Sequence, residues 1–237
     1  MKYIASLSGG KDSVAMVLRL IEESWPLDEV IYYDNGMDFS AIYDVVYNQV
    51  NPILQEHGVK LVTLHPKTEF LWDMFERPVN GKNGPHKGYS WCGGLARWGT
   101  NYKTRVCNKY CRGSSQYIGI AYDELSRVKD KIYPLVQWQM TEADCLQYCR
   151  NHGIHWTEHT KNGDIDLYDI LDRVSCWCCC NKNLKELEAI YTYLPEYWEK
   201  LKWLQSKTDR PFKKYGTVFE LEERFNKNKK TIIRYNN

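Results

Sequence analysis

Apolar residues follow two alternating patterns along the chain, short runs typical of buried strands and longer stretches with helical spacing. The first apolar run, at residues 2–7, leads directly into a Ser-Gly-Gly turn. After the turn, apolar side chains recur on one face of a helix, at Val14, Val17, Leu18 and Ile21. The amino-terminal part of the chain is therefore expected to fold as strand, turn and helix.

The same alternation continues over the next hundred residues. Further strands are expected at 28–33, 60–64, 116–121 and 131–136, and helices at 41–57, 100–112 and 141–152. Thr141 suits the start of the last helix and Gly153 its end. Because alternating strands and helices are typical of parallel sheets, the sequence predicts an α/β fold with a Rossmann-like, doubly wound, mostly parallel five-stranded sheet.

Two regions depart from this alternation. Residues 65–98 are rich in glycine and proline but also hold aromatic side chains, which favours an ordered lid loop. Near the carboxyl end, helices are expected at 184–193 and 196–205, followed by a basic tail at 224–234 that is typical of a solvated chain end, with a nucleic-acid contact as the alternative. We expect a nucleotide-binding domain at 1–180 and a C-terminal helical extension at 181–237.

Composition narrows the class of protein only slightly. The 32 basic and 30 acidic residues give a formal net charge of +2, which neither demands nor excludes a nucleic-acid partner. No apolar run approaches the ~20 residues that cross a bilayer, and no signal peptide precedes the first strand. We expect a cytoplasmic protein without a membrane partner, in which the nine cysteines are first considered as metal or cluster ligands.

The turn after the first strand has the residues of an anion site. It consists of Ser8, Gly9, Gly10, Lys11, Asp12 and Ser13. The glycines allow backbone N–H groups to turn toward a phosphate, the helix start adds its positive dipole end, and the serines and lysine add hydroxyls and a charge. The spacing differs from the Walker phosphate loop, so its mechanics do not transfer.

This turn resembles the signature of the PP-loop superfamily, which includes ATP pyrophosphatases, thiolation enzymes and phosphoadenosine phosphosulfate (PAPS) reductases. Further motifs, spread from Tyr3 to about Trp203, resemble the PAPS reductase family. Residues 33–39 resemble the family's D-x-G-x-E-F stretch, which implies that Asp34, Gly36 and Met37 lie beside the adenosine. Asp34 could equally cap a turn.

Two more segments imply nucleotide contacts through the same resemblance. Residues 97–103 resemble R-W-C-T-x-x-L-K, with Gly99 where a cysteine is usual, and imply roles for Arg97 and Lys103. Lys103, like Arg105, could instead be an exposed helix charge. Residues 118–127 resemble the segment ending in D-E-x-x-R, which makes Asp123, Glu124 and Arg127 candidates for nucleotide or metal contacts. Residues 133–138 and 141–144 resemble a further family element that we interpret as scaffold.

A cysteine cluster at 172–180 resembles the R-x-S-C-W-C-C-P element of this branch. Cys176 and Cys179 form a C-x-x-C pair that can hold a metal, and Cys178 lies between them. Cys92 is expected to replace the cysteine missing at position 99. The candidate ligands Cys176, Cys179, Cys178 and Cys92 would bind either a [4Fe-4S] cluster or zinc.

Four other cysteines are spaced as pairs on helix faces. Cys107 and Cys111 are four residues apart, as are Cys145 and Cys149. The first pair could complete a metal site or be buried, whereas the second pair is interpreted as core because free cysteine is commonly buried.

The predicted reaction follows from what the chain lacks. Sulfonucleotide reductases carry a nucleophilic cysteine in a C-terminal E-C-G-x-H segment, and this chain has no cysteine after Cys180. The leading hypothesis is therefore ATP-dependent adenylation of an acceptor with pyrophosphate release, for sulfur transfer to nucleic acid or a small molecule. Lys11, Asp12, Lys103 and Arg127 would be catalytic, with Mg²⁺ positioned by Asp12.

Two alternatives stay open. The chain could use PAPS or adenosine phosphosulfate (APS) as a sulfonucleotide reductase, with a thiol reductant protein in place of a sulfur donor. It could also be a non-catalytic nucleotide-sensing or nucleic-acid-binding module with a structural metal. All three hypotheses share an adenine nucleotide as ligand, and none sets the oligomeric state.

Overall fold

The computed structural model describes the backbone of residues 1–82, 84–174 and 176–235, and side chains within these ranges as far as residue 227. Ser175 of the cysteine motif and most side chains of the basic tail lie outside the described residues. Contacts divide the chain into two compact units, each built from two segments. The sheet unit comprises Met1–Lys67 and Asn101–Glu158, and the cysteine unit comprises Thr68–Thr100 and His159–Asn237.

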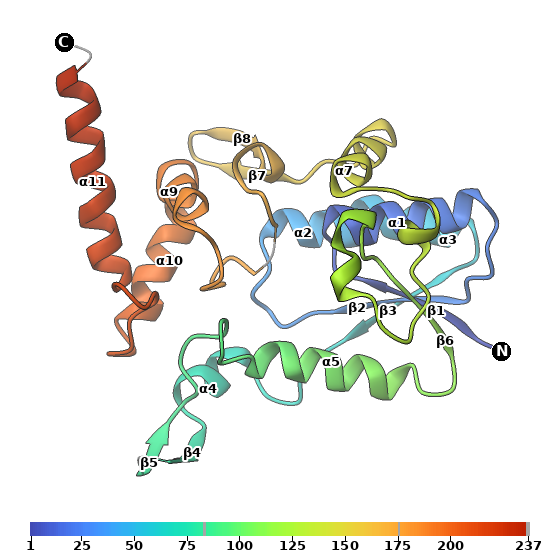
Figure 1. The fold of residues 1–237 in the computed structure, drawn as a ribbon, viewed down its shortest axis with the longest axis horizontal. Coiled ribbons are helices and arrows are strands. Elements are labelled where there is room, and N and C mark those ends of the chain that lie inside the picture. The colour runs from blue at the N-terminus through green and yellow to red at the C-terminus, as the bar shows by residue number, and fades with distance from the viewer. Residues whose placement is uncertain (83, 175, 236–237) are drawn as a thin grey trace. The chain divides into compact units, whose positions relative to one another are not determined.

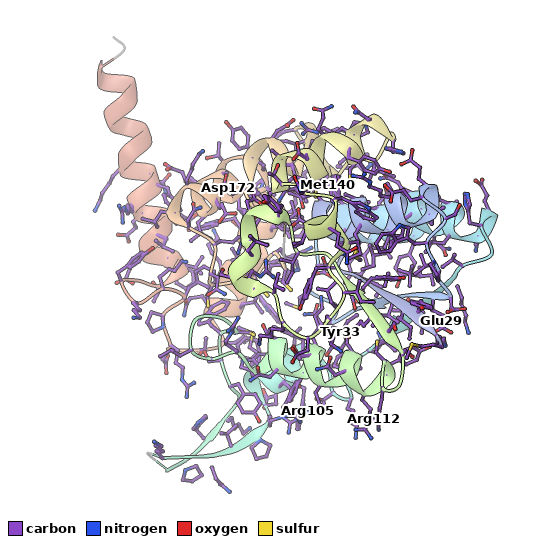
Figure 2. The ribbon with its side chains drawn as sticks, turned by 45° about the vertical axis from the view of Figure 1, so that its right-hand side comes forward. Glu29, Tyr33, Arg105, Arg112, Met140 and Asp172 are labelled. Carbon is purple, nitrogen blue, oxygen red and sulfur yellow. The ribbon has the colours of Figure 1, made fainter. Side chains whose placement is uncertain are left out.

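A four-stranded parallel sheet forms the centre of the sheet unit. Its strands are β1 (Tyr3–Leu7), β2 (Glu29–Tyr33), β3 (Lys60–Leu64) and β6 (Ser115–Ile118), in the order β3-β2-β1-β6. Ile4 of β1 pairs with Glu29 on one side and with Gln116 on the other. Figure 2 shows Glu29 and Tyr33 at the two ends of β2. The predicted Rossmann-like α/β fold is confirmed.

The predicted fifth strand at 131–136 is wrong. Ile132 makes one parallel bridge to Tyr117, and the short helix α6 (Pro134–Gln137) begins two residues later. Pro134 explains the difference, because proline has no N–H for a sheet ladder and its fixed φ suits the first turn of a helix.

Helices cover both faces of this sheet, as a doubly wound fold requires. One face carries α1 (Lys11–Glu22), α2 (Ser40–Asp44), a π-helical turn (Val45–Val50) and α3 (Asn51–Glu56), while α5 (Trp98–Tyr110) lies on the other (Figure 1). The predicted helix at 41–57 is thus divided by its π-helical turn. A 3₁₀ segment (Tyr122–Arg127) follows β6, and α7 (Glu142–Asn151) packs beside α1. Thr141 caps α7, as predicted.

Both cysteine pairs of the sheet unit belong to its core. Cys111 is buried with Ile4 and Ile31, and Cys107 packs against this cluster. Cys145 and Cys149 are fully buried. Of the two alternatives for Cys107 and Cys111, the structure favours burial over a metal site.

The cysteine unit holds shorter elements and the C-terminal helices. The predicted lid loop at 65–98 instead contains α4 (Phe70–Phe75) and an antiparallel hairpin of β4 (Pro78–Gly81) and β5 (Gly84–Lys87). Strand β7 (Thr157–Thr160) begins in the sheet unit and ends in the cysteine unit, and it is followed by β8 (Gly163–Asp166), α8 (Leu167–Ile170), α9 (Leu184–Tyr193), α10 (Pro195–Gln205) and α11 (Val218–Tyr235). The predicted C-terminal helices are confirmed to within a residue, but the tail, which was expected to be a solvated chain end, belongs to the helix α11.

No helix in the described part of the chain has the length and apolarity to cross a membrane.

Trp156 is fully buried in the sheet unit, where its indole N–H donates to the Gly9 carbonyl at 2.7 Å. Trp156→Phe leaves that carbonyl without its donor, so the free energy of unfolding should fall by about 1–3 kcal/mol. Urea denaturation measures this change. The half-exposed Trp203 is the matched control, and Trp203→Phe should change stability by less than about 0.5 kcal/mol. Equal effects of the two substitutions would refute the structural role of Trp156.

Candidate functional site

The turn between β1 and α1 has a backbone that only glycine permits. Gly9 has φ +77°, and a Cβ placed there would lie 2.7 Å from Cγ2 of Ile42 and 3.2 Å from Cγ2 of Val46. The Trp156 indole holds its carbonyl oxygen from the other direction. Gly9 is therefore packed into a left-handed conformation that a residue with a side chain would disrupt.

The two serines of this turn bind each other. Ser13 Oγ accepts the backbone N–H of Ser8 at 3.0 Å, lies 2.9 Å from Ser8 Oγ, and donates to the Gly10 carbonyl at 2.9 Å. Gly10 is the N-cap of α1 and provides no side chain for the first N–H groups of the helix. This helix start and its two hydroxyls have the chemistry that binds a phosphate oxygen.

The Lys11 side chain is almost fully buried, with 8% of its surface exposed. Its Nζ lies 2.6 Å from Oε2 of Glu142 and 3.5 Å from Oδ1 of Asp12. Burial lowers the pKa of Lys11, but the two carboxylates outweigh burial and the pKa is raised. Lys11 therefore stays positively charged at neutral pH.

For Asp12, burial outweighs the effect of the opposite charge beside it. Burial, together with the charges of Glu142 and Glu124, raises its pKa to about 6 although Lys11 acts to lower it. Oδ1 of Asp12 is buried and accepts no hydrogen bond from the described residues. A carboxylate oxygen of this kind fits Mg²⁺, which prefers hard oxygen ligands, and Asp12 is the residue that would hold the ion here.

The segment after β6 lies against the start of α1. A Cβ at Gly119 would be 2.8 Å from Cα of Ser13, so only glycine allows this approach. Asp123 accepts the backbone N–H of Glu142, at 3.1 Å to Oδ1, and Glu124 forms an ion pair with Arg127. The structure thus brings the predicted Asp123 and Glu124 close to the phosphate loop.

Glu142 is a residue of the phosphate-loop site that sequence reasoning missed. It lies in a segment interpreted as scaffold, 131 residues from the lysine that it contacts. The one local signal is its position as an acidic residue in the first turn of α7, which is ordinary for helices.

The predicted adenosine residues show mainly local contacts. Asp34 accepts from the N–H of Gly36 at 2.8 Å and from the hydroxyl of Tyr43 at 2.9 Å, which matches the turn-capping alternative. Gly36 adopts φ +76° and Met37 is buried. An adenosine contact for these residues stays a prediction.

The cationic side chains considered for a phosphate or sulfate contact lie on α5. Arg105 is exposed and stacks over Tyr102 at 5.7 Å, while Lys103 lies near Cys107. Figure 2 shows Arg105 on α5 and Arg112 just beyond its end. A phosphate or sulfate contact of Lys103 stays a prediction.

The four predicted ligand cysteines lie close enough to influence one another. Burial raises the pKa of the Cys178 thiol well above its ordinary value, and Cys176, Cys179 and Cys92 raise it further. The N–H of Cys179 donates to the Cys176 carbonyl at 3.1 Å, which closes a tight turn. The cysteine unit therefore gathers thiols from two distant segments of sequence.

Cys92 lies beside Gly99, and its predicted role as a metal ligand stays a prediction. A Cβ at Gly99 would lie only 3.0 Å from Cys92 Sγ, so the sulfur occupies space that a side chain at position 99 would need. Burial raises the pKa of Cys92, while N–H groups of Gly99 and Thr100 and the nearby Arg97 lower it. Arg97 is exposed beside this thiol, and its predicted role at a nucleotide stays untested.

Two lysines that sequence reasoning did not single out support the cysteine turn. Lys213 Nζ donates to the carbonyls of Cys180, at 2.6 Å, and of Lys182. Lys182 is buried and donates to the Arg173 carbonyl at 3.1 Å. Burial lowers the pKa of both lysines, although nearby cysteines raise it. Their charges favour the thiolate forms that metals and clusters require.

The thiols fit a metal or cluster by their chemistry but do not form a closed shell. Within 1–82, 84–174 and 176–227, no group of three or more His, Cys, Asp or Glu side chains is arranged to hold a metal ion. Cys180 Sγ lies 3.4 Å from the Cys92 carbonyl, and a Cβ at Gly93 would be 2.4 Å from that sulfur. Cys92 is thus held beside the 176–180 turn by packing of its neighbours.

Comparison with known proteins gives distant likenesses. No family model matches the chain. The chain is 22% identical over 202 residues to the uncharacterised protein MJ0066 of Methanocaldococcus jannaschii, a match that covers 83% of this chain but only 40% of that protein. Among solved structures it is similar to the U34-tRNA thiolase NcsA from Methanococcus maripaludis with its [4Fe-4S] cluster, at 14% identity and a TM-score of 0.44, over 96% of this chain and 71% of that chain. Neither likeness assigns a family or a reaction.

The raised pKa of Asp12 predicts a pH dependence of stability. Because the folded state holds the Asp12 proton more tightly than the unfolded state, wild-type stability should fall relative to Asp12→Asn as pH rises from 4 to 7. The expected difference is about 2–3 kcal/mol, since the pKa is raised by about two units and one unit corresponds to about 1.4 kcal/mol. Urea denaturation without divalent cations measures it, with Asp130→Asn as the exposed control. Parallel pH profiles of wild type and Asp12→Asn would contradict the burial of this carboxyl.

Proposed function

We propose that this chain is an ATP-binding enzyme that activates an acceptor by adenylation and releases pyrophosphate. The observation that carries the proposal is the turn from Ser8 to Ser13, where a glycine-only backbone presents a helix start beside the buried Lys11 ammonium. A rigid loop with one permanent positive charge is suited to hold phosphates in a fixed orientation, which is the main requirement for attack at phosphorus.

The carboxylate of Asp12 gives this loop a place for Mg²⁺. A bound Mg²⁺ would neutralise charge on the departing pyrophosphate. Lys11 would hold a phosphate oxygen, and the hydroxyls of Ser8 and Ser13 would exchange their mutual hydrogen bond for bonds to the ligand. Arg127 and Lys103 are the further cations that we propose for the polyphosphate, on the basis of the resemblance to PAPS reductases.

We further propose that Cys92, Cys176, Cys178 and Cys179 hold a [4Fe-4S] cluster or zinc. Support comes from the mutual electrostatic influence of these thiols and from the position of Cys92 in the space beside Gly99. A bound cluster would take part in sulfur transfer or electron transfer, whereas a zinc ion would stabilise the fold. The acceptor is proposed to be a nucleic acid or a small molecule, with a separate protein as sulfur donor.

The nucleotide proposal predicts that Lys11→Ala weakens ATP binding by about 10- to 100-fold, the usual effect of removing a charge-assisted contact worth about 1.5–3 kcal/mol. Isothermal titration calorimetry with Mg²⁺ measures the affinity, and a coupled assay measures pyrophosphate. The exposed Lys60 serves as the matched control, since Lys60→Ala removes the same charge from the same unit. Wild-type protein that binds PAPS or APS but not ATP, and releases sulfite with a thiol donor, would replace adenylation with sulfonucleotide reduction.

The thiol proposal predicts that anaerobically purified protein contains iron and sulfide or zinc, and that Cys176→Ser with Cys179→Ser removes the metal. Cys92→Ser should lower the metal content, and adding Gly99→Cys to that variant should restore it, because the two positions compete for the same space. Absorbance spectra and metal analysis give the readout. Cys145→Ser, in the core of the sheet unit, is the control and should keep the full metal content. Metal-free wild-type protein would end this proposal.

A further inference from the structure

Glu142 reaches the phosphate loop from a different helix. It is the first residue of α7, and its Oε2 lies 2.6 Å from Lys11 Nζ. The exposed fraction is 8% for the Lys11 side chain and 28% for that of Glu142. An ion pair this short and this far from solvent is stronger than an exposed one, because water screens it less.

The structure fixes Glu142 through its backbone. Its N–H donates to both carboxylate oxygens of Asp123, at 3.1 and 3.3 Å. The preceding residue, Thr141, forms a capping box with Asp144, in which each side chain accepts a backbone N–H of the other residue. Three backbone N–H groups, those of Thr141, Glu142 and Asp144, therefore hold the start of α7 in place. The position of the Glu142 carboxylate beside Lys11 thus depends on these backbone contacts as well as on the ion pair.

Three carboxyl groups influence one another around this ion pair. The carboxyl of Asp12 interacts unfavourably with those of Glu142 and Glu124. Lys11 pairs with Glu142, and Arg127, which is more than half exposed, pairs with Glu124. A polyphosphate without a cation would bring several further negative charges next to Glu142, whereas a cation-loaded polyphosphate brings fewer.

We infer that Glu142 is a positioning and specificity residue of the phosphate loop, which holds the Lys11 ammonium before nucleotide binds and makes the loop favour cation-loaded over metal-free polyphosphates. The inference rests on the proposed nucleotide binding and assigns Glu142 a role within it. Asp123 acts indirectly, because its carboxylate holds the backbone N–H of Glu142 in the first turn of α7. The catalytic contact with phosphate belongs to Lys11.

The first test compares ATP affinities with Mg²⁺ and with EDTA in wild type, Glu142→Gln and Glu56→Gln. Glu56 lies exposed at the end of α3, so its substitution removes the same charge from the same unit without touching the loop. Glu142→Gln should tighten metal-free ATP by about tenfold, as expected for removing one nearby like charge, and should change Mg-ATP binding by less than about threefold. Glu56→Gln should leave both values as in wild type. An unchanged ratio of the two affinities in Glu142→Gln would overturn the specificity role.

A second readout needs no nucleotide. In protein labelled with ¹⁵N-lysine, the ion pair should slow exchange of the Lys11 ammonium protons with water in wild type and Glu56→Gln, and the protection should disappear in Glu142→Gln. Lys11→Ala assigns the signal. Persistence of the protected signal in Glu142→Gln would overturn the positioning role. Wild-type protein that shows the protected signal but binds no nucleotide would confirm the Glu142 contact while refuting the proposed function.

Discussion

Burial of the Lys11 ammonium at the start of α1 is the constraint on which the candidate nucleotide site depends. A buried cation is stable only when carboxylates lie close to it, and Asp12 and Glu142 meet that need from two different helices. Burial raises the pKa of Asp12, and the charges of Glu142 and Glu124 raise it further, although the Lys11 ammonium acts to lower it. The carboxylates that lie around the buried ammonium repel one another, and Asp12 therefore keeps its proton to a higher pH than an ordinary aspartic acid.

Close packing of small residues has a comparable effect on the geometry of both units. Gly9 lets Ile42 press against the phosphate loop, and Gly119 lets the chain after β6 approach Ser13. In the cysteine unit, Gly99 leaves room for the Cys92 sulfur. In each case another group fills the space that a Cβ would need, so a substitution there would displace that neighbouring group.

Local patterns in the sequence were sufficient for much of this picture. The strand, turn and helix around Ser8 follow from adjacent residues, as does the cap of α7 at Thr141. The fifth strand was wrong because the apolar run at 131–136 has the period of a strand, while Pro134 starts a helix. The contact of Glu142 with Lys11 joins residues 131 positions apart, and no local pattern encodes such a pairing. Lys182 and Lys213 were missed for the same reason, because the carbonyl groups to which they donate come close to them only in the folded chain.

The cysteine unit shows how charge and packing can prepare thiols without closing a metal shell. Cys178 is buried, so its neutral thiol is favoured while no metal balances its charge. Lys182 and Lys213 add positive charge beside the same turn, and they oppose that preference. A divalent metal or an iron–sulfur cluster would shift the balance decisively, because metal bonds replace the proton on sulfur. The buried Lys182 and the partly buried Lys213 would then face thiolates in place of neutral thiols, and the cost of removing their charges from water would fall.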